Sequence, residues 1–183
     1  GAGGFYVDNP NFGVGRVDLR SGNNTGDAVW GDGYVEPSVN FTFDPAENLT
    51  LFGEASVVFA ATVGEGDAGG FTNGDEGDAT LEKASLGFKT SFSGPGEAPW
   101  TLELSGGKQD VQIGDGWLFW DGNFDAFGDT AYWLAPRTAF EWAGTADLTN
   151  GSLGLKPFFV IGDHDQDSSE IIGGDLRFEQ DWG

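Results

Sequence analysis

The sequence predicts an all-β protein, an antiparallel up-and-down meander that forms a transmembrane β-barrel or part of one. Three observations predict this fold class. Apolar and polar residues alternate with period two over many segments, as they do along strands with two different faces. These segments run for about ten residues, the length at which a tilted strand crosses an outer membrane. Short turns and long loops alternate along the chain, as the hairpins of a meander require.

The first predicted strands lie in the N-terminal third of the chain. A weak strand is expected over 12–20. Over 35–43 one face reads Val, Pro, Val, Phe, Phe and the other reads Glu, Ser, Asn, Thr. Over 51–63 leucine, valine and phenylalanine share one face with glycine and alanine. The second and third segments are therefore predicted to be strands with one apolar and one polar face.

The remaining strands continue the same pattern, which brings the expected total to about eight. Over 83–92, Ala84, Leu86 and Phe88 alternate with lysine, serine and glycine. Over 132–142, Tyr132 and Leu134 begin a similar alternation. The other three segments show shorter stretches of period two, and they are 100–105, 153–161 and 176–180.

The connections between these strands fall into two classes. Short turns are expected at 44–48, 93–99 and 144–151, where Asp-Pro, Gly-Pro-Gly and Asn-Gly supply turn chemistry. Long loops rich in Gly and Asp are expected at 21–33, 64–80, 106–129 and 162–170. A Greek-key sandwich would mix connection lengths without this alternation. No shift in composition marks a second domain, so residues 1–183 are predicted to form a single β-barrel domain.

Charged residues fall opposite the apolar face in nearly every predicted strand. An ordinary sheet would turn its polar face to water, whereas a membrane barrel turns its apolar face to lipid and its polar face to the lumen. The strand lengths, the aromatic residues near strand ends and the lack of a second layer to cover the apolar face favour the barrel. The aromatic residues are Phe43, Phe92, Trp100, Tyr132 and Trp142. The basic residues of the polar face are Arg16, Arg20, Lys83, Lys89, Arg137, Lys156 and Arg177, and the acidic ones are Asp18, Glu36, Glu54, Glu103, Glu141, Asp175 and Glu179.

Three prolines oppose this interpretation. Pro37, Pro136 and Pro157 fall inside predicted strands, where each removes an N–H donor from the ladder. A closed barrel has no edge strand to hold them, so they would need bulges or positions near the membrane boundary.

Composition excludes several other classes of protein. The chain has 8 Lys and Arg against 30 Asp and Glu, a formal net charge of −22, and a field this negative repels nucleic-acid phosphates. The absence of cysteine excludes disulfides and thiol sites. A zinc site would have to use carboxylates and the single histidine, His164. The 16 Phe, 7 Trp and 3 Tyr residues argue against disorder despite the charge and the 32 glycines.

One stretch resembles a known family. Segment 106–118 reads Gly-Gly-Lys-Gln-Asp-Val-Gln-Ile-Gly-Asp-Gly-Trp-Leu, and it leads through an Asp- and Gly-rich loop to 131–140, which reads Ala-Tyr-Trp-Leu-Ala-Pro-Arg-Thr-Ala-Phe. This resembles the alginate-export family of outer-membrane barrels. In that family a strand ending in a Gly-Lys/Arg-Gln motif leads into a Gly-Asp-Gly loop, and the next strand carries an arginine. The resemblance is sharpest over 100–142 and extends weakly to the whole chain.

The resemblance implies a passive channel for polar or anionic solutes such as polysaccharide, with basic side chains along its pore. Lys108 and Arg137 are the positions that match the family motif. Lys83, Lys89 and Lys156 are added as lumen-lining residues from strand parity alone. For each of these residues the alternative is a solvated cation or a lumen ion pair, such as Arg137 with Glu141.

The sequence departs from the family in two ways. Barrels of that family have more strands than are expected here, and they usually end on an aromatic residue, whereas this chain ends Asp-Trp-Gly. Both departures suggest that the chain is the N-terminal part of a larger barrel. The alternative is a complete eight-stranded barrel, whose interior would be filled with side chains and would conduct poorly.

Two loops carry further candidate residues. Asp163, Asp165 and Asp167 have the spacing that opens a calcium loop, although the residues that follow do not complete the EF-hand pattern. A solvated acidic loop is the alternative. Ca²⁺ is the only cofactor that the sequence suggests. The aromatic residues of the loop at 106–129 are predicted to fold back and constrict the barrel, or alternatively to stack on sugars, and they are Trp117, Phe119 and Trp120.

The predicted protein is therefore a porin-like channel of the bacterial outer membrane. Its expected partners are the lipid bilayer, lipopolysaccharide and a polar or anionic solute, with no nucleic acid and no prediction of oligomeric state. The alternative is a secreted β-sandwich that binds carbohydrate or calcium. The chain is predicted not to be an enzyme, because it has one histidine and no Gly-x-Ser-x-Gly motif. A glycosidase-type carboxylate pair among the 30 acidic residues is a third hypothesis.

Overall fold

The computed structural model is all-β over the residues it describes. These are 1–7, 16–17, 24–25, 28–67, 72, 74–95, 98–114, 116, 119, 121–123, 130–134, 136–163 and 169–178, with backbone alone at 16–17 and 24–25. The one helical element in these ranges is a single 3-10 turn, η1 (Tyr132–Leu134). Within them, no helix has the length and apolar character needed to cross a membrane.

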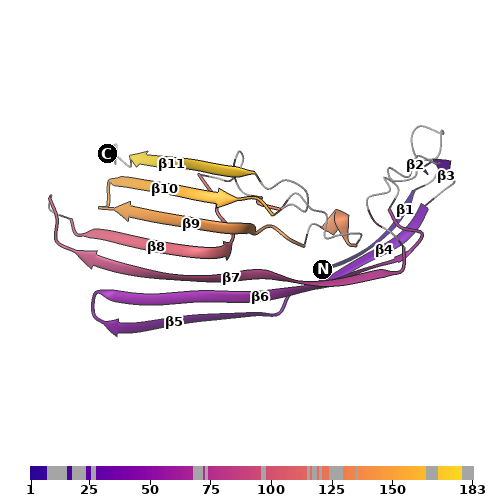
Figure 1. Ribbon diagram of the computed structural model, residues 1–183, viewed down its shortest axis with the longest axis horizontal. Helices are drawn as coiled ribbons and strands as arrows, with labels where there is room; N and C mark the ends of the chain where they lie inside the picture. The colour runs from indigo at the N-terminus through magenta and orange to yellow at the C-terminus, as the bar shows by residue number, and fades with distance from the viewer. Residues whose placement is uncertain are drawn as a thin grey trace, which may run out of the picture. The chain divides into compact units, whose positions relative to one another are not determined.

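The strands form one nine-stranded antiparallel sheet and a separate two-residue ladder of β2 with β3. The sheet path runs β1-β4-β6-β7-β8-β9-β10-β11, with β5 also paired to β6 (Figure 1). The strands are β1 (Ala2–Val7), β2 (Arg16–Val17), β3 (Asn24–Thr25), β4 (Ala28–Val35), β5 (Ser38–Ala46), β6 (Leu49–Gly64), β7 (Glu76–Phe92), β8 (Trp100–Gln109), β9 (Phe140–Thr149), β10 (Leu153–Ile161) and β11 (Glu170–Phe178).

The predicted antiparallel meander is confirmed, but the closed barrel is not. The path ends at β1 and at β11, and each of these strands has a single neighbour among the described residues. A closed barrel needs a hydrogen-bonding partner on both sides of every strand. The described sheet is therefore open. No second sheet packs on it in these residues beyond the β2–β3 ladder, so the sandwich alternative gains no support.

The chain divides into two compact units. The first, here called the β4 unit, contains residues 1–37, 57–81 and 125–137. The second, here called the β5–β11 unit, contains 38–56, 82–124 and 138–183. Strands β6 and β7 contribute one part of their length to each unit.

Two expected elements are wrong. Residues 21–33 were expected to be a loop, but β4 begins inside this range at Ala28, because its Gly-Asp-Gly centre hides the alternation of strand residues around it. The strand expected over 132–142 is absent, because η1 occupies its start and the described residues 136–139 are irregular. Ala131 has a φ of 49°, which breaks an extended conformation before η1. The strand begins only at Phe140 and runs through most of the turn expected at 144–151.

Other boundaries shift by a few residues. Strand β8 continues to Gln109, into the loop expected from 106, and β7 begins at Glu76, inside the loop expected to 80. Strand β11 begins earlier than the expected 176. Of the weak strand at 12–20, the structure describes only the two residues of β2.

The three prolines are accommodated in different ways. Pro37 lies in the gap between β4 and β5, where its carbonyl accepts a hydrogen bond from the Val57 N–H at 3.2 Å. Strands β4 and β5 pair with successive stretches of β6, so the break lets one side of β6 be covered by two strands. Pro136 lies outside the strands. Pro157 lies within β10 opposite Gly174 of β11, and it has no paired residue on β9.

The β5–β11 unit has two chemically different faces, and its register assigns residues to them. Phe41 pairs with Gly53, and a Cβ built on Gly53 would meet both Phe41 and Leu86, so these residues share one face. The pairing of Leu86 with Gly106 and of Gly106 with Gly144 carries that face across β8 to β9. This outer face continues on β10 and β11 through pairs such as Phe159 with Ile172 and Leu155 with Leu176.

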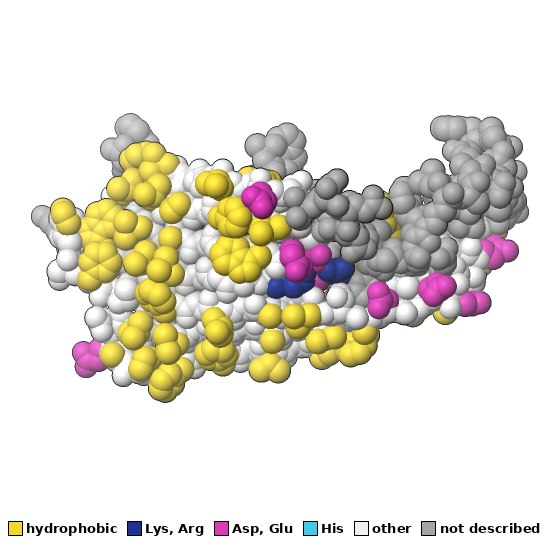
Figure 2. Space-filling model, viewed as in Figure 1, with side chains coloured by type: hydrophobic (Ala, Val, Ile, Leu, Met, Phe, Trp, Pro, Cys, Tyr) yellow, Lys and Arg dark blue, Asp and Glu magenta, His cyan; other side chains and the backbone are white. Residues whose placement is uncertain are grey.

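The outer face is apolar and exposed. Leu86 is 66 % exposed, Ile172 83 % and Phe178 74 %. Other large hydrophobic residues of this face are also exposed, and they include Val39, Phe41, Phe43, Leu51, Phe92, Trp142, Leu155 and Leu176. Figure 2 shows hydrophobic side chains in patches over this part of the sheet, with few charged side chains among them. The apolar face of the predicted strands is therefore the face that no layer of the described residues covers.

The opposite, inner face carries polar residues and the hydrophobic core of the unit. Val111, Phe140, Ala143 and Val160 are buried there, and the partly buried Phe158 packs against them. In the β4 unit the same division appears along β6. Val58, Ala60 and Thr62 are buried while Phe59, Ala61 and Val63 are exposed, although the second set is the more regularly apolar.

Candidate functional site

Charged side chains of the β5–β11 unit gather where β7, β8, β9 and β10 meet the long loops. Strand β8 reaches this end through Gly107, whose φ of 129° lies outside the range of residues with a side chain. A Cβ at Gly107 would also strike the backbone of Ala84 and Ser85 on the neighbouring strand. The β8–β9 register shifts between Gly107 and Gln109. This glycine bulge places Lys108 beside the loops.

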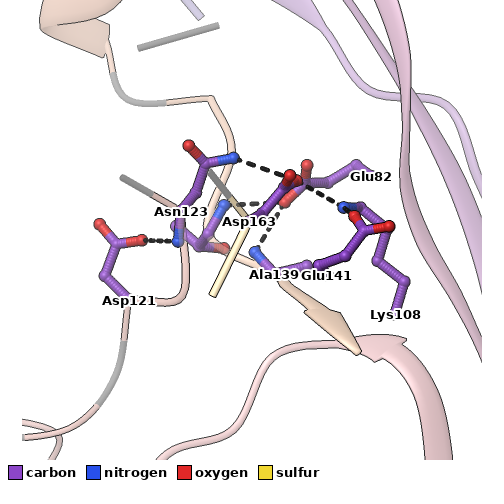
Figure 3. Close-up of polar contacts among 8 residues, drawn as sticks. Glu82, Lys108, Asp121, Asn123, Ala139, Glu141 and Asp163 are labelled. Atoms are coloured by element: carbon purple, nitrogen blue, oxygen red, sulfur yellow. Dashed lines mark hydrogen bonds and ion pairs between the residues drawn. The ribbon is translucent and has the colours of Figure 1, made fainter. Parts of the chain in front are cut away.

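Lys108 joins two carboxylates from different segments (Figure 3). Its ammonium lies 2.8 Å from Glu141 Oε2 on β9 and 2.5 Å from Asp163 Oδ2, just after β10. The Lys108 side chain is only 11 % exposed, so these ion pairs are screened less than surface pairs. The Asn123 side-chain amide donates to the same Asp163 oxygen at 3.5 Å. The cluster therefore connects β8, β9, the end of β10 and the loop after β8.

Glu82 and Lys83 make a second set of contacts at this end. Glu82 is 1 % exposed, and its Oε1 accepts hydrogen bonds from the backbone N–H groups of Thr138 and Ala139 at 2.7 and 2.8 Å. The ammonium of Lys83 donates to Asp110 Oδ2 at 2.5 Å, and Asp110 Oδ1 accepts from the Thr138 hydroxyl at 2.8 Å. Consecutive residues of β7 thus hold the chain just before β9 in place.

The loop that follows β8 folds over the inner face. Val111, Ile113 and Phe119 pack with the core of β9 and β10. The ring of Phe119 lies 4.8 Å from that of Phe158 and 5.3 Å from that of Phe140. Farther on, the Gly122 N–H donates to the Thr138 carbonyl at 2.9 Å, and the Gly122 carbonyl accepts from the Asp163 N–H at 2.8 Å. We call residues 110–123 the inward loop.

The inner face along the strands carries further ion pairs. Arg177 donates to both oxygens of Asp147 at 2.7 Å, and its Nε lies 3.2 Å from Asp175. Lys89 lies 3.7 Å from Glu103, and both side chains are about half exposed. Lys156 donates to the Gln112 carbonyl of the inward loop at 3.3 Å. These cations therefore face either carboxylates or the loop that covers the face.

Asp121 in the inward loop has a perturbed carboxyl group. Partial desolvation by the surrounding loop raises the pKa of Asp121 above its ordinary value. The hydrogen bond from the Asn123 N–H, at 2.9 Å, opposes this rise, and the nearby negative charge of Asp110 adds to it.

The β4 unit has a polar contact chain of its own. Asp32 is 3 % exposed and accepts hydrogen bonds from Trp30 Nε1 at 3.2 Å and from the Thr62 hydroxyl at 2.7 Å. The Thr62 oxygen in turn accepts from the Ala131 N–H at 2.7 Å. These hydrogen bonds hold the segment before η1 against β4 and β6. On the exposed side of these strands, a shallow apolar groove of about 630 Å³ is lined mainly by glycine, alanine and valine.

The residues predicted to line a lumen fall in different places. Lys89 and Lys156 lie on the inner face, and Lys83 and Lys108 lie at its long-loop end. Arg137 belongs to the β4 unit and precedes β9, so it is not on a strand as the family resemblance implied. Glu141, the partner named for Arg137 in the alternative of a lumen ion pair, lies 2.8 Å from Lys108. Whether any of these residues lines a pore stays a prediction.

The loop residues are only partly described. Phe119 packs inward as stated above, whereas Trp117 and Trp120 lie outside the described residues. Asp163 is described and contacts Lys108 and Asn123, whereas Asp165 and Asp167 lie outside the described residues. Among the described residues, no group of three or more His, Cys, Asp or Glu side chains is arranged to hold a metal ion.

Sequence reasoning missed four members of the site: Glu82, Asp110, Asn123 and Thr138. Glu82 had one detectable signal. It is charged and adjacent to Lys83, so a regular strand would put one of the two charges on the apolar face. The structure instead brings both to the same segment. The other three lie in irregular chain, where no period marks them.

Comparison with known proteins adds no relative. No family model, curated protein or solved structure matches the chain. The resemblance to the alginate-export family therefore stays a prediction that rests on the quoted motif. What the arrangement can do has to be argued from its own geometry, which is a one-layer sheet with an apolar exposed face and a charged, partly covered inner face.

Proposed function

We propose that this chain forms a β-barrel, or part of one, in the bacterial outer membrane and contributes to a passive channel for polar solutes. In this proposal the outer face contacts lipid and the inner face borders the water-filled passage. The expected partners are the bilayer with its lipopolysaccharide and the solute that passes.

The observation that carries the proposal is the reversed polarity of the β5–β11 unit. A water-soluble sheet buries its apolar face and leaves its polar face in water. Here Leu86, Ile172 and Phe178 are among the most exposed residues, while Ser85 on the opposite face is 8 % exposed. Soluble monomers rarely expose apolar patches of more than a few hundred Å². Lipid is the environment in which such a face costs nothing to expose.

Strand length supports the same proposal. Strands β8 to β11 have 9 or 10 residues, and β6 and β7 have 16 and 17. A strand needs about 9–11 residues to cross a bilayer at a tilt of about 45°, whereas strands of globular proteins average about five or six. The longest strands extend beyond this length, as outer-membrane strands do where they project above the lipid.

The inner face supports a channel instead of a solid barrel core. Its strands carry the ion pairs of Lys89 and Arg177, which need water or close partners to be stable. The described part of the inward loop leaves the side chains of Lys89, Glu103 and Arg177 about half exposed. In the proposed channel the inward loop narrows the passage, with Phe119 at the centre of its packing, and Lys83, Lys89, Lys108 and Lys156 border the passage.

The direct test compares two adjacent residues on β5 that belong to opposite faces. The chain contains no cysteine, so Val39→Cys and Asn40→Cys each introduce one labelling site. We expect the full chain to fold only when detergent micelles or phosphatidylcholine vesicles are present. A fluorophore at position 39 should then be quenched by brominated lipid, and one at position 40 by aqueous iodide.

Two results would contradict the proposal. One is a full chain that is β-folded and monomeric in buffer without detergent. The other is equal quenching of the two labels by iodide in vesicles, because a lipid-facing strand must distinguish its two faces. Strand content by circular dichroism serves as the control that both variants have folded.

A further inference from the structure

We infer that the passage along the inner face favours cations and neutral solutes over anions. This inference rests on the proposed channel and names its solute class. It differs from the expectation drawn from the family resemblance, in which basic side chains attract an anionic polysaccharide. The reason is that four of the five cations that the structure describes on this face and at its long-loop end already contact carboxylates.

The first step is the partner of each cation. Lys83 contacts Asp110, Lys89 contacts Glu103, and Lys108 contacts two carboxylates at once. Arg177 likewise contacts Asp147 and Asp175. A cation within about 4 Å of a carboxylate presents little net field to a passing ion, because the two charges cancel at longer distance. Basic residues alone therefore do not make this face attractive to anions.

The second step is the excess of carboxylates. On the inner face and at its long-loop end, the cations with described side chains are Lys83, Lys89, Lys108, Lys156 and Arg177. The carboxylates outnumber them and are Glu54, Glu82, Glu103, Asp110, Asp121, Glu141, Asp147, Asp163 and Asp175. Once each cation has been paired, negative charge remains. The sign of the remaining field is therefore negative.

The third step is the position of this excess. Asp110 begins the inward loop and accepts a hydrogen bond from the Thr138 hydroxyl at the long-loop end, and Asp121 lies farther along the same loop. The hydrogen bond from the Asp163 N–H to the Gly122 carbonyl holds Asp163 beside the loop. Lys156 donates a hydrogen bond from its ammonium to the Gln112 carbonyl of this loop. Walls of low dielectric constant focus the field of fixed charges into a narrow passage. The narrowest part of the passage thus carries the negative field.

The experiment measures ion selectivity in planar bilayers of phosphatidylcholine. The full chain is reconstituted, and the reversal potential is recorded under a gradient of KCl. We expect the sign that corresponds to K⁺ passing more readily than Cl⁻, and we expect this preference to weaken at high salt as the charges are screened. A preference for Cl⁻, or none, would overturn the inference and leave the channel standing.

A different result would overturn the proposed function itself. If the face-labelling experiment shows the protein inserted in lipid but no conductance is recorded, the channel is wrong and the selectivity falls with it. The two failures are therefore distinguishable, because one concerns the sign of the potential and the other the presence of current.

A matched pair of variants locates the effect. Glu141→Gln removes an exposed carboxylate from the Lys108 cluster. A unit charge about 8 Å away in water changes the Boltzmann factor of an ion about 2.4-fold, in opposite directions for K⁺ and Cl⁻, so the ratio of K⁺ to Cl⁻ permeability should fall about sixfold. Glu47→Gln removes an exposed carboxylate from the turn between β5 and β6, at the opposite end of the strands from the inward loop, and it should leave the ratio unchanged. Equal shifts in both variants would contradict the assignment to the loop end.

Discussion

The two faces of the β5–β11 unit are made of the same strands but are stabilised in different ways. On the outer face, residues such as Phe41 and Leu86 are exposed and few contacts restrain them. On the inner face, ion pairs, buried hydrogen bonds and the packing of Phe119 hold the loop and the strands together. The difference teaches that specific contacts fix the geometry on one side only. The other side is apolar and exposed, and in the proposed function it needs only an apolar surrounding.

The strongest way to break this comparison is to place a charge on each face in turn. Phe41→Arg puts a guanidinium on the outer face, and Thr42→Arg puts one on the inner face of the same strand. A lipid-facing arginine costs about 2–4 kcal/mol near the bilayer midplane. We therefore expect Phe41→Arg to lower the free energy of unfolding in vesicles by about this amount, as measured by urea titration. Thr42→Arg should change it by less than about 0.5 kcal/mol.

The reverse order would identify a water-exposed outer face. In a soluble protein an exposed phenylalanine is replaced by arginine with little effect, because surface substitutions are usually tolerated. Equal stability of the two variants would thus contradict the membrane proposal while leaving the described sheet unchanged.

A second test compares how tightly the two faces are packed by adding one methyl group to a glycine on each face. At Gly87 on the inner face, a Cβ would strike the ring of Phe52 and lie 2.5 Å from the Leu104 carbonyl oxygen. At Gly106 on the outer face, the nearest atom is the Ala143 carbonyl oxygen at 3.8 Å. Gly87→Ala should therefore destabilise the fold by about 1–3 kcal/mol, measured by urea titration as above. Gly106→Ala serves as the control and should be tolerated, and a similar loss in both would mean that the faces are equally packed.

A third test concerns the ion pairs of the inner side. Lys108→Met leaves Glu141 and Asp163 without their shared cation, and because Lys108 is largely buried we expect a loss of about 1–2 kcal/mol. Limited proteolysis should also cut the inward loop faster, since Asp163 anchors it. Lys89→Met is the control, because its pair is half exposed at 3.7 Å and should contribute at most a few tenths of a kcal/mol. Unchanged proteolysis of Lys108→Met would show that the cluster does not hold the loop.

The smallest expected effect is a dependence on pH. The pKa of Asp121 is raised in the folded chain, so the folded state disfavours its charged form, and wild type is destabilised at pH values above that pKa. Asp121→Asn should therefore be slightly more stable than wild type at pH 7. The advantage should vanish as pH falls below 3.8, the ordinary value, where the carboxyl is protonated in both states. A variant equally stable relative to wild type at pH 7 and pH 3 would contradict this.

Much of the sheet could be predicted because its strands alternate strictly. Strand β6 alternates over nearly its whole length, and its apolar face was correctly separated from its polar face. Strand β4 was missed because glycine at positions 31 and 33 and Asp32 between them read as a turn. The opposite error occurred at 132–142, where alternating aromatic residues resemble a strand. The alternation of apolar and polar residues cannot show that Ala131 has a left-handed backbone conformation, which prevents a strand there.

The site was less predictable than the sheet. Parity identified Lys83 and Lys89, because a strand's period applies to every residue along it. It could not identify their partners, which come from loops and distant strands. Asp110 and Thr138 meet Glu82 and Lys83 only because the chain between β8 and β9 returns to the same edge of the sheet. Such contacts depend on the path of a loop, and neither composition nor strand periodicity predicts that path.

The glycines of the sheet have one more consequence. At Gly87 the ring of Phe52, and at Gly173 the ring of Phe158, occupies the space where a Cβ would stand. Each ring therefore lies down along the backbone of the neighbouring strand and does not project from it. A large aromatic group then adds little height to the inner face. The glycines therefore limit how far these two rings narrow the space on the polar side of the sheet.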